Sequence, residues 1–118
     1  MKRVPSAELP YEVESVDIVA ELPDLVVSEM VLASGQEVPW HLHSNVTDTF
    51  YGLSGCTSIR YGKDGEVLLH PGESIAVPAR TPHRVACSGG ESSRFVIVQG
   101  IGSYDFIPCR APSGRSDD

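Results

Sequence analysis

The sequence has no long apolar run and few cysteines. No apolar run approaches the roughly 20 residues of a membrane-spanning helix, and residues 1–10 hold no apolar segment of the kind found in a secretory signal. We therefore expect no membrane partner. The three cysteines, Cys56, Cys87 and Cys109, are odd in number and lack a paired spacing. This pattern favours free thiols in a reducing cytoplasm over a disulfide framework.

Basic residues are also scarce. Nine Lys and Arg face sixteen Asp and Glu, which gives a net charge of −7. A negative surface repels phosphate groups, so we expect no nucleic-acid partner, and the same charge keeps a soluble protein dispersed. The length of 118 residues and the hydrophobic fraction of 41% predict one domain with its own core.

Helical periodicity is absent as well. Short segments rich in β-branched residues alternate with Gly and Pro turn signals at a spacing of about 8–12 residues, which predicts an antiparallel sandwich or barrel. The Asp64-Gly65 pair lies between two such segments and indicates a hairpin. The predicted strands are 11–20, 25–33, 38–43, 49–53, 56–61, 66–69, 74–77, 83–88, 94–99 and 104–107.

The two ends of the chain differ from this middle part. Residues 1–10 contain Pro5 and Pro10 and predict either a loose arm or an added edge strand. Residues 110–118 have nothing to bury and are predicted to be disordered. The single barrel domain is thus expected to cover residues 11–109.

The four histidines are unevenly placed. His41 and His43 are two residues apart on a predicted strand, so both side chains project from the same face. His83 begins another strand directly after Pro82, and a proline makes the chain rigid on the approach to that residue. A rigid approach suits a preformed metal site. His70, before Pro-Gly, is most simply a turn residue. Spacing alone does not distinguish three metal ligands from surface histidines.

Two segments of the chain carry a more specific pattern. They are Gly35-x5-His41-x-His43-x4-Asp48-x6-Gly55 and Gly72-x5-Pro78-x-Arg80-x2-His83-x3-Cys87. In order and separation they resemble the two motifs of the cupin family. The resemblance implies an all-β, double-stranded β-helix (jelly-roll) barrel, one metal ion held by His41, His43, Asp48 and His83, and a homodimer. Three positions depart from the family pattern, which has Glu at 48, Gly at 80 and Asn at 87.

Asp48 is one methylene shorter than the family's glutamate. Its reach is shorter by about 1.3–1.5 Å, and a metal–oxygen bond of about 2.0–2.2 Å leaves little tolerance. Asp48 can therefore be a direct ligand, a contact through water or a catalytic base, or it can be absent from the metal site. Without it, a three-histidine site remains.

Other residues near the motifs have two interpretations each. Arg80 can pair with a substrate carboxylate or can be a solvated loop charge. Trp40 and Phe50 flank the ligand segments and are weak candidates for substrate binding, with core packing as the alternative. Cys87 lies about 13 Å beyond His83 along the strand, which favours a small core residue over a ligand.

Three imidazoles with an optional carboxylate leave open positions on a divalent transition metal. Iron(II), manganese, zinc, nickel and copper all fit this donor set. The resemblance implies either a small metal-dependent enzyme acting on a small organic anion, such as a dioxygenase, isomerase, lyase or cyclase, or a non-catalytic module that binds a small-molecule ligand. The fold does not choose between them.

Overall fold

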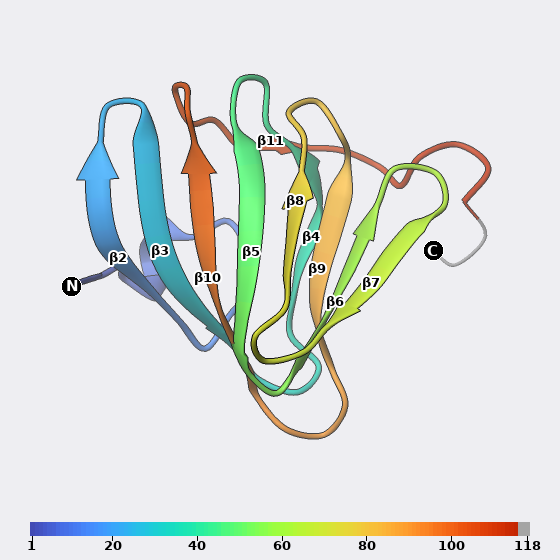
Figure 1. Ribbon diagram of the computed structural model, residues 1–118, viewed down its shortest axis with the longest axis horizontal. Coiled ribbons are helices and arrows are strands. Elements are labelled where there is room, and N and C mark those ends of the chain that lie inside the picture. Colours follow the sequence, from blue (N-terminus) through green and yellow to red (C-terminus); the bar gives the residue numbers. More distant parts are fainter. Residues whose placement is uncertain (116–118) are drawn as a thin grey trace.

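The computed structural model describes residues 1–115 and consists of two antiparallel β-sheets that face each other (Figure 1). The first sheet has the order β1-β2-β3-β10-β5-β8 and the second β11-β4-β9-β6-β7. This is the predicted all-β jelly roll, and the described residues contain no α-helix. The elements are β1 (Lys2–Arg3), η1 (Ser6–Glu8), β2 (Ser15–Leu22), β3 (Leu25–Leu32), β4 (Glu37–Leu42), β5 (Thr47–Ser54), β6 (Cys56–Tyr61), β7 (Gly65–Leu69), β8 (Ser74–Val77), β9 (His83–Ser88), β10 (Ser93–Gly100) and β11 (Ile107–Pro108).

Each predicted strand corresponds to an observed one, and the hairpin at Asp64-Gly65 joins β6 to β7. Two predictions extend too far. The strand predicted from residue 11 begins at Ser15, and of the segment 104–107 only Ile107 is in a strand. Residues 104–106 leave the sheet because Asp105 uses its carbonyl and carboxylate oxygens to bind His43 and Ser44 instead of a neighbouring strand.

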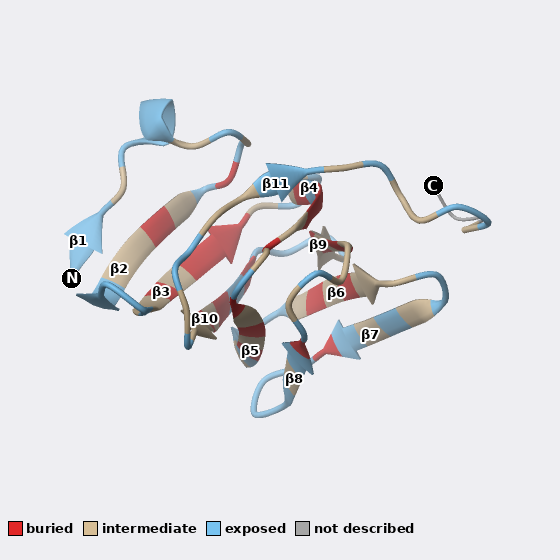
Figure 2. Cartoon of the chain, turned by 90° about the horizontal axis from the view of Figure 1, so that it is seen from above, coloured by how far each residue is buried: buried red, intermediate tan, exposed pale blue. Residues whose placement is uncertain are grey.

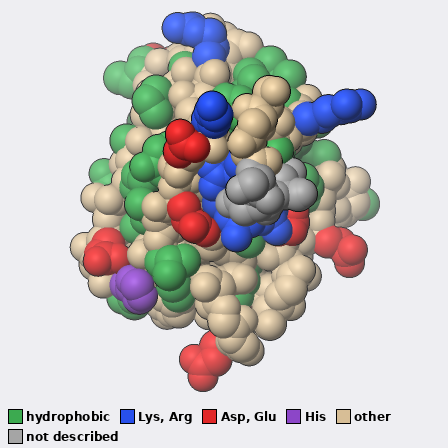
Figure 3. Space-filling model, turned by 90° about the vertical axis from the view of Figure 1, so that its right-hand side faces the viewer, with side chains coloured by type: hydrophobic (Ala, Val, Ile, Leu, Met, Phe, Trp, Pro, Cys, Tyr) green, Lys and Arg blue, Asp and Glu red, His purple; other side chains and the backbone are tan. Residues whose placement is uncertain are grey.

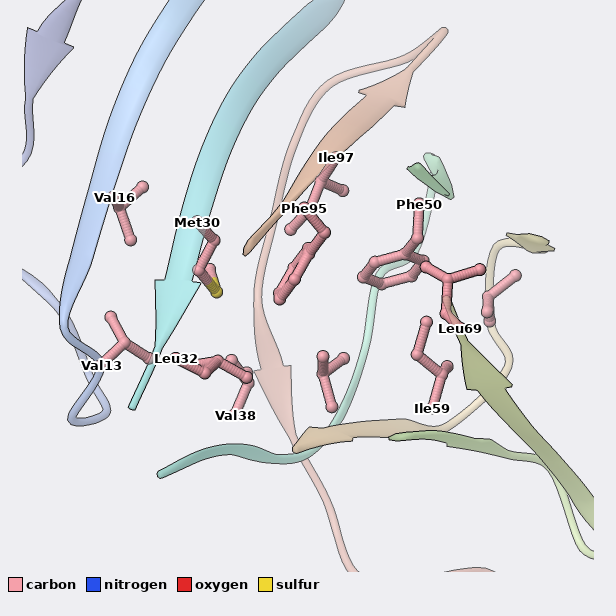
Figure 4. Packing of buried hydrophobic residues seen from close by; sticks show 12 residues of the cluster. Val13, Val16, Met30, Leu32, Val38, Phe50, Ile59, Leu69, Phe95 and Ile97 are labelled. Atoms are coloured by element: carbon pink, nitrogen blue, oxygen red, sulfur yellow. The ribbon is translucent and has the colours of Figure 1, made fainter. Parts of the chain in front are cut away.

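The core lies between the inner faces of the two sheets (Figure 2). Because side chains alternate along a strand, β9 and β10 contribute every second residue to the core, while β1 and β11 are exposed. Phe50 and Phe95 are at most 1% exposed and their ring centroids are 5.9 Å apart. Burying each large apolar side chain contributes about 1.5–3 kcal/mol. Figure 4 shows this cluster, which includes Val13, Val16, Met30, Leu32, Val38, Phe50, Ile59, Leu69, Phe95 and Ile97.

Both ends of the described part of the chain contact the barrel. Residues 2 and 3 pair with β2 as an edge strand, and Arg3 Nε lies 2.6 Å from Asp17 Oδ1. At the other end, the Arg115 guanidinium lies 5.3 Å from the centroid of the Trp40 ring, and its Nη1 donates to Gly62 O at 3.1 Å. The prediction of a disordered tail overlooked this cation–π contact. Residues 116–118, the rest of that predicted tail, lie outside the described residues.

The outer face of the second sheet carries ion pairs. Arg84 holds Glu37 through two hydrogen bonds of 3.0 and 2.6 Å, and Arg60 Nε lies 3.1 Å from Glu66. Figure 3 shows acidic and basic side chains next to one another on this side of the molecule. No helix in residues 1–115 is long and apolar enough to cross a membrane.

Candidate metal centre

Four predicted ligands meet inside the barrel. His41 is the fifth residue of β4 and pairs with His83, the first residue of β9, while His43 follows β4 directly. Asp48 enters from β5, on the opposite sheet. All four side chains are buried, and one ligand atom from each lies within 4.8 Å of the others. Pairing of β4 with β9 thus brings together two residues that are 42 positions apart (41 to 83) in the sequence, and the facing sheet adds Asp48.

A backbone carbonyl fixes the tautomer of each of the three histidines. His41 Nδ1 donates to Pro39 O at 2.7 Å, His83 Nδ1 donates to Thr81 O at 2.9 Å, and His43 Nδ1 donates to Asp105 O. A carbonyl oxygen only accepts hydrogen bonds, so each Nδ1 carries a proton and Nε2 is the ring atom that faces the other members of the cluster. Metal-binding histidines in proteins have this same outer support.

Asp48 adds a fourth acceptor to the cluster. Its Oδ2 lies 3.0 Å from His43 Nε2 and 2.9 Å from His83 Nε2. Two ligands bonded at about 2.0–2.2 Å to one ion and at right angles are about 2.8–3.1 Å apart. The observed separations fit that requirement. The shorter aspartate therefore lies close enough to His43 and His83 for all three to bind one ion.

Burial and the neighbouring charges shift the protonation of these groups. Burial, with the proximity of His83, lowers the pKa of His41 to about 3, so this ring is neutral at neutral pH. Burial by itself raises the pKa of Asp48, but hydrogen bonds from His43 and His83 outweigh it and hold that pKa below its usual value. Burial opposes a charge on His43, yet its bond to Asp48 raises its pKa. The cluster thus contains an ionised carboxylate that attracts a cation.

Residues outside the two motifs support the ligands. Gln99 pairs with Asp48 across β10 and β5, and its Nε2 donates to Asp48 Oδ1 at 3.1 Å. Asp105 also accepts the backbone N–H of Ser44 at 2.8 Å, which fixes the loop after His43. The sequence analysis missed both residues. The alternation of β10 could have indicated Gln99, since it continues the inward series of Phe95 and Ile97 as a polar residue.

A cavity of about 190 Å³ lies beside the cluster. His41, His43 and Asp48 line it together with Phe50 and mainly apolar side chains. Aromatic rings cover the histidines: Phe106 stacks on His41 with ring centroids 4.5 Å apart, and Tyr104 lies 5.3 Å from His43. No Lys or Arg of the described residues lines this cavity.

Two predicted substrate residues lie elsewhere. Trp40 alternates with His41 on β4, so its side chain is on the other face of the sheet, beneath Arg115. Arg80 directs its guanidinium to Ser44 O at 3.3 Å and does not line the cavity. Its φ is +64°, which explains why glycine suits this position. Its backbone N–H donates to His43 O at 2.7 Å, so Arg80 supports a ligand through its backbone.

The fold and the site define a double-stranded β-helix protein with a buried cluster of three histidines and one carboxylate that can hold a metal ion. A family model described as "Cupin domain" matches residues 28–99, and the chain belongs to the cupin family. None of the curated proteins matches it.

Several solved structures are similar to this chain. An uncharacterized conserved protein with a double-stranded β-helix domain from Klebsiella pneumoniae is 30% identical, with a TM-score of 0.70 over 87% of this chain and 86% of that one. TT1209 from Thermus thermophilus is 25% identical, with a TM-score of 0.68 over 79% and 90% of the two chains. KdgF from Halomonas sp. is 18% identical, with a TM-score of 0.67 over 86% and 94%, and this likeness shows the fold alone.

Proposed function

We propose that the protein is a metal-dependent enzyme that acts on a small organic monoanion inside the barrel. The observation that carries the proposal is the set of four inward-facing acceptor atoms of His41, His43, Asp48 and His83, within 4.8 Å of one another. The Asp48 carboxylate and the buried Nε2 atoms lie so close together that they need a proton or a cation between them. A divalent transition metal would bind all four groups at once in place of the shared protons.

The charge of the site favours a substrate with one negative charge. Three neutral imidazoles, one carboxylate and a divalent ion sum to one positive charge. Because no described Lys or Arg lines the cavity, an anionic group has only the metal to bind. The lining also includes the exposed Glu21. Its carboxylate disfavours a second negative charge on the substrate.

The size of the cavity limits the substrate further. Its volume of about 190 Å³ is slightly larger than a cavity of about 150 Å³ that holds benzene. The lining is mainly apolar and includes Phe50 and Phe106. A compact molecule with an apolar body and one oxygen-bearing end fits both the shape and the polarity of the site.

When bound, the metal supplies Lewis acidity toward a substrate oxygen or, for a redox-active ion, access to dioxygen chemistry. The protein's own groups supply orientation and a proton. Both oxygens of Asp48 are engaged, one by Gln99 and one by the histidines, so Asp48 is better suited to holding the metal than to moving protons. Tyr104 lines the cavity, and burial, with nearby Tyr11 and Asp48, raises its pKa. It therefore keeps its phenolic proton at neutral pH and can donate a hydrogen bond to substrate.

The test begins with elemental analysis of the purified protein and of His83→Ala. We expect about one divalent metal per chain in the parent and almost none in the variant. The protein is then loaded anaerobically with iron(II) and screened for oxygen uptake with catechols, thiols and diketones. The zinc, manganese and nickel forms are screened under argon by NMR for isomerisation or elimination of small 2-oxo acids.

Turnover that requires the metal and is lost in a folded His83→Ala variant would support an enzyme. Saturable binding of a small anion by the metal-loaded protein, with no turnover of any compound, would favour the non-catalytic binding module. Equal metal content in the parent and His83→Ala would overturn the metal site itself.

A further inference from the structure

A second group of chemically reactive side chains lies at the other end of the barrel. Cys56 begins β6, just after the end of β5, and His70 and Glu73 belong to the turn between β7 and β8. Ser54 is six residues along β5 from Asp48, or about 20 Å. In Figure 1 the turn that precedes β6 and the loop that precedes β8 lie together at the lower end of the molecule. This group is therefore separate from the metal centre.

The three side chains contact one another in series. Cys56 Sγ lies 3.8 Å from His70 Nε2, and His70 Nδ1 lies 3.2 Å from Glu73 Oε1. Hydrogen bonds from the backbone and the ring of His70 lower the pKa of Glu73, so this group is an ionised acceptor at neutral pH. Glu73 thereby holds the proton of the ring on Nδ1 and leaves the lone pair of Nε2 facing the thiol. A nucleophile, a base and a group that orients the base are thus arranged in order.

The backbone of β5 holds this turn in place. Gly52 N donates to Glu73 O and Gly72 N donates to Gly52 O, both at 3.0 Å, and His70 N donates to Glu73 Oε1 at 2.8 Å. A Cβ on residue 52 would lie 2.4 Å from His70 O, so only glycine permits this approach. Backbone contacts therefore fix the turn that carries His70 next to the start of β6, where Cys56 lies.

The other two cysteines have different surroundings. The Cys87 thiol donates to Glu91 O at 2.8 Å, and burial raises the pKa of Cys109. Cys56 is half-buried, while the side chains of His70 and Glu73 are 58% and 57% exposed. A small reagent in solution can thus reach the sulfur that has a base beside it.

We propose that Cys56 is a base-assisted reactive thiol and a site of modification by low-molecular-weight disulfides. His70 Nε2 accepts the thiol proton as the Cys56 sulfur attacks one sulfur of the disulfide R–S–S–R. The new Cys56–S–S–R bond forms while the S–S bond of the reagent breaks. The departing thiolate takes the proton from His70 and leaves as R–SH. The only co-reactant is the disulfide. One half of it leaves as the free thiol, and the other half becomes part of the mixed disulfide as the Cys56 thiol is oxidised.

The test uses the full chain with Cys87→Ser and Cys109→Ser, so that Cys56 is the single thiol. The probes are 5,5′-dithiobis(2-nitrobenzoate), followed by absorbance, and glutathione disulfide, followed by mass spectrometry of the Cys56 peptide. A synthetic peptide of residues 53–59 gives the rate of the same thiol without His70. We expect the folded protein to react about tenfold faster than the peptide at neutral pH.

Variants of the two supporting residues separate the chemistry from packing. His70→Asn should lower the rate about tenfold, while Glu73→Ala should lower it less. Glu73→Gln should recover most of the Glu73→Ala loss, because its amide oxygen still accepts the Nδ1 proton. Circular dichroism and thermal melting show that each variant is folded. A chain that retains only Cys109 is the matched control and should not respond to His70→Asn.

Two results would overturn the proposal. One is a folded Cys56 that reacts no faster than the peptide. The other is a rate that His70→Asn leaves unchanged in a folded protein. Either would mean that His70 and Glu73 only brace the turn.

Discussion

The four histidines of this chain fall into two environments that share one hydrogen-bonding pattern. Each ring donates from Nδ1 to an oxygen and presents Nε2 to another group. For His41, His43 and His83 that oxygen is a backbone carbonyl, and the rings are 1–3% exposed. For His70 it is the Glu73 carboxylate, and the side chain is 58% exposed. The residue type is the same in both environments. The environments differ in burial and in the number of side chains that converge on Nε2.

The difference has a physical basis. In the interior, His41 on β4, His43 just after β4 and His83 on β9 converge with Asp48 in a volume from which water is excluded. The carboxylate and the buried ring nitrogens need a proton or a cation between them, and this favours the binding of a cation. At the surface, water satisfies any lone pair that the protein leaves open. His70 faces a single thiol there and retains the character of a base.

The largest expected contrast is in metal binding. His83→Ala should lower bound divalent metal from about one per chain to almost none, because it removes one of four converging ligands. His70→Ala, the matched surface change, should leave the metal content unchanged. Inductively coupled plasma mass spectrometry of both proteins, normalised to protein concentration, measures the difference. An equal loss of bound metal in His83→Ala and His70→Ala would mean that the buried and the exposed histidines do not differ in metal binding.

Asp48→Asn is expected to have the next largest effect. It keeps the size of the side chain but replaces the anionic oxygen that lies 2.9–3.0 Å from two histidines. We expect zinc affinity to fall about 100-fold, at the upper end of the losses seen when groups around a metal are altered. Competition with a chromophoric chelator gives the affinity. Asp48→Glu, which restores the usual cupin residue, should keep the affinity within about tenfold of the parent, and an affinity unchanged in Asp48→Asn would show that Asp48 is not a ligand.

Gln99→Leu should have a smaller effect on the same measurement. It removes the donor to Asp48 Oδ1 and leaves the carboxylate less firmly oriented. We expect about a tenfold loss of metal affinity. Tyr104→Phe keeps the ring that packs against His43 and removes only a hydroxyl that contacts Gln99, so affinity should fall less than in Gln99→Leu while any turnover decreases. A Gln99→Leu protein with full affinity would mean that the histidines alone position Asp48.

The smallest expected effect concerns the pH dependence of stability at the surface site. The pKa of Glu73 is lowered in the folded state, so its contribution is complete above its ordinary value of 4.5 and is lost as pH falls through the lower folded value. Glu73→Gln should therefore melt slightly below the parent at neutral pH, and the difference should shrink as the pH falls below 4.5. Differential scanning calorimetry across this range measures the convergence. If the difference in melting temperature between the two proteins is the same in acid, Glu73 stabilises the turn through packing and not through its charge.

Much of the site could be predicted from local pattern. The i, i+2 spacing places His41 and His43 on one face of a strand, and Pro82 makes the chain rigid just before His83. The carbonyl partners of His41 and His83 lie two residues earlier, at Pro39 and Thr81, so this support is also local in the sequence. The strands followed from alternation and turn residues, because these depend on neighbours along the chain.

Contacts between distant segments could not be predicted in the same way. Gln99 reaches Asp48 only because β10 pairs with β5, and Asp105 reaches His43 only because residues 101–106 cross the end of the barrel. The outward direction of Trp40 and Arg80, and the turn that places His70 beside Cys56, also depend on the complete fold.

The sequence by itself determined the class of fold and singled out three histidines that can hold a metal ion together, since periodicity and spacing act over a few residues. The tertiary structure decided whether Asp48 joins this cluster. Its reach depends on how closely β5 approaches β4 and β9, and that distance is set by packing between the two sheets.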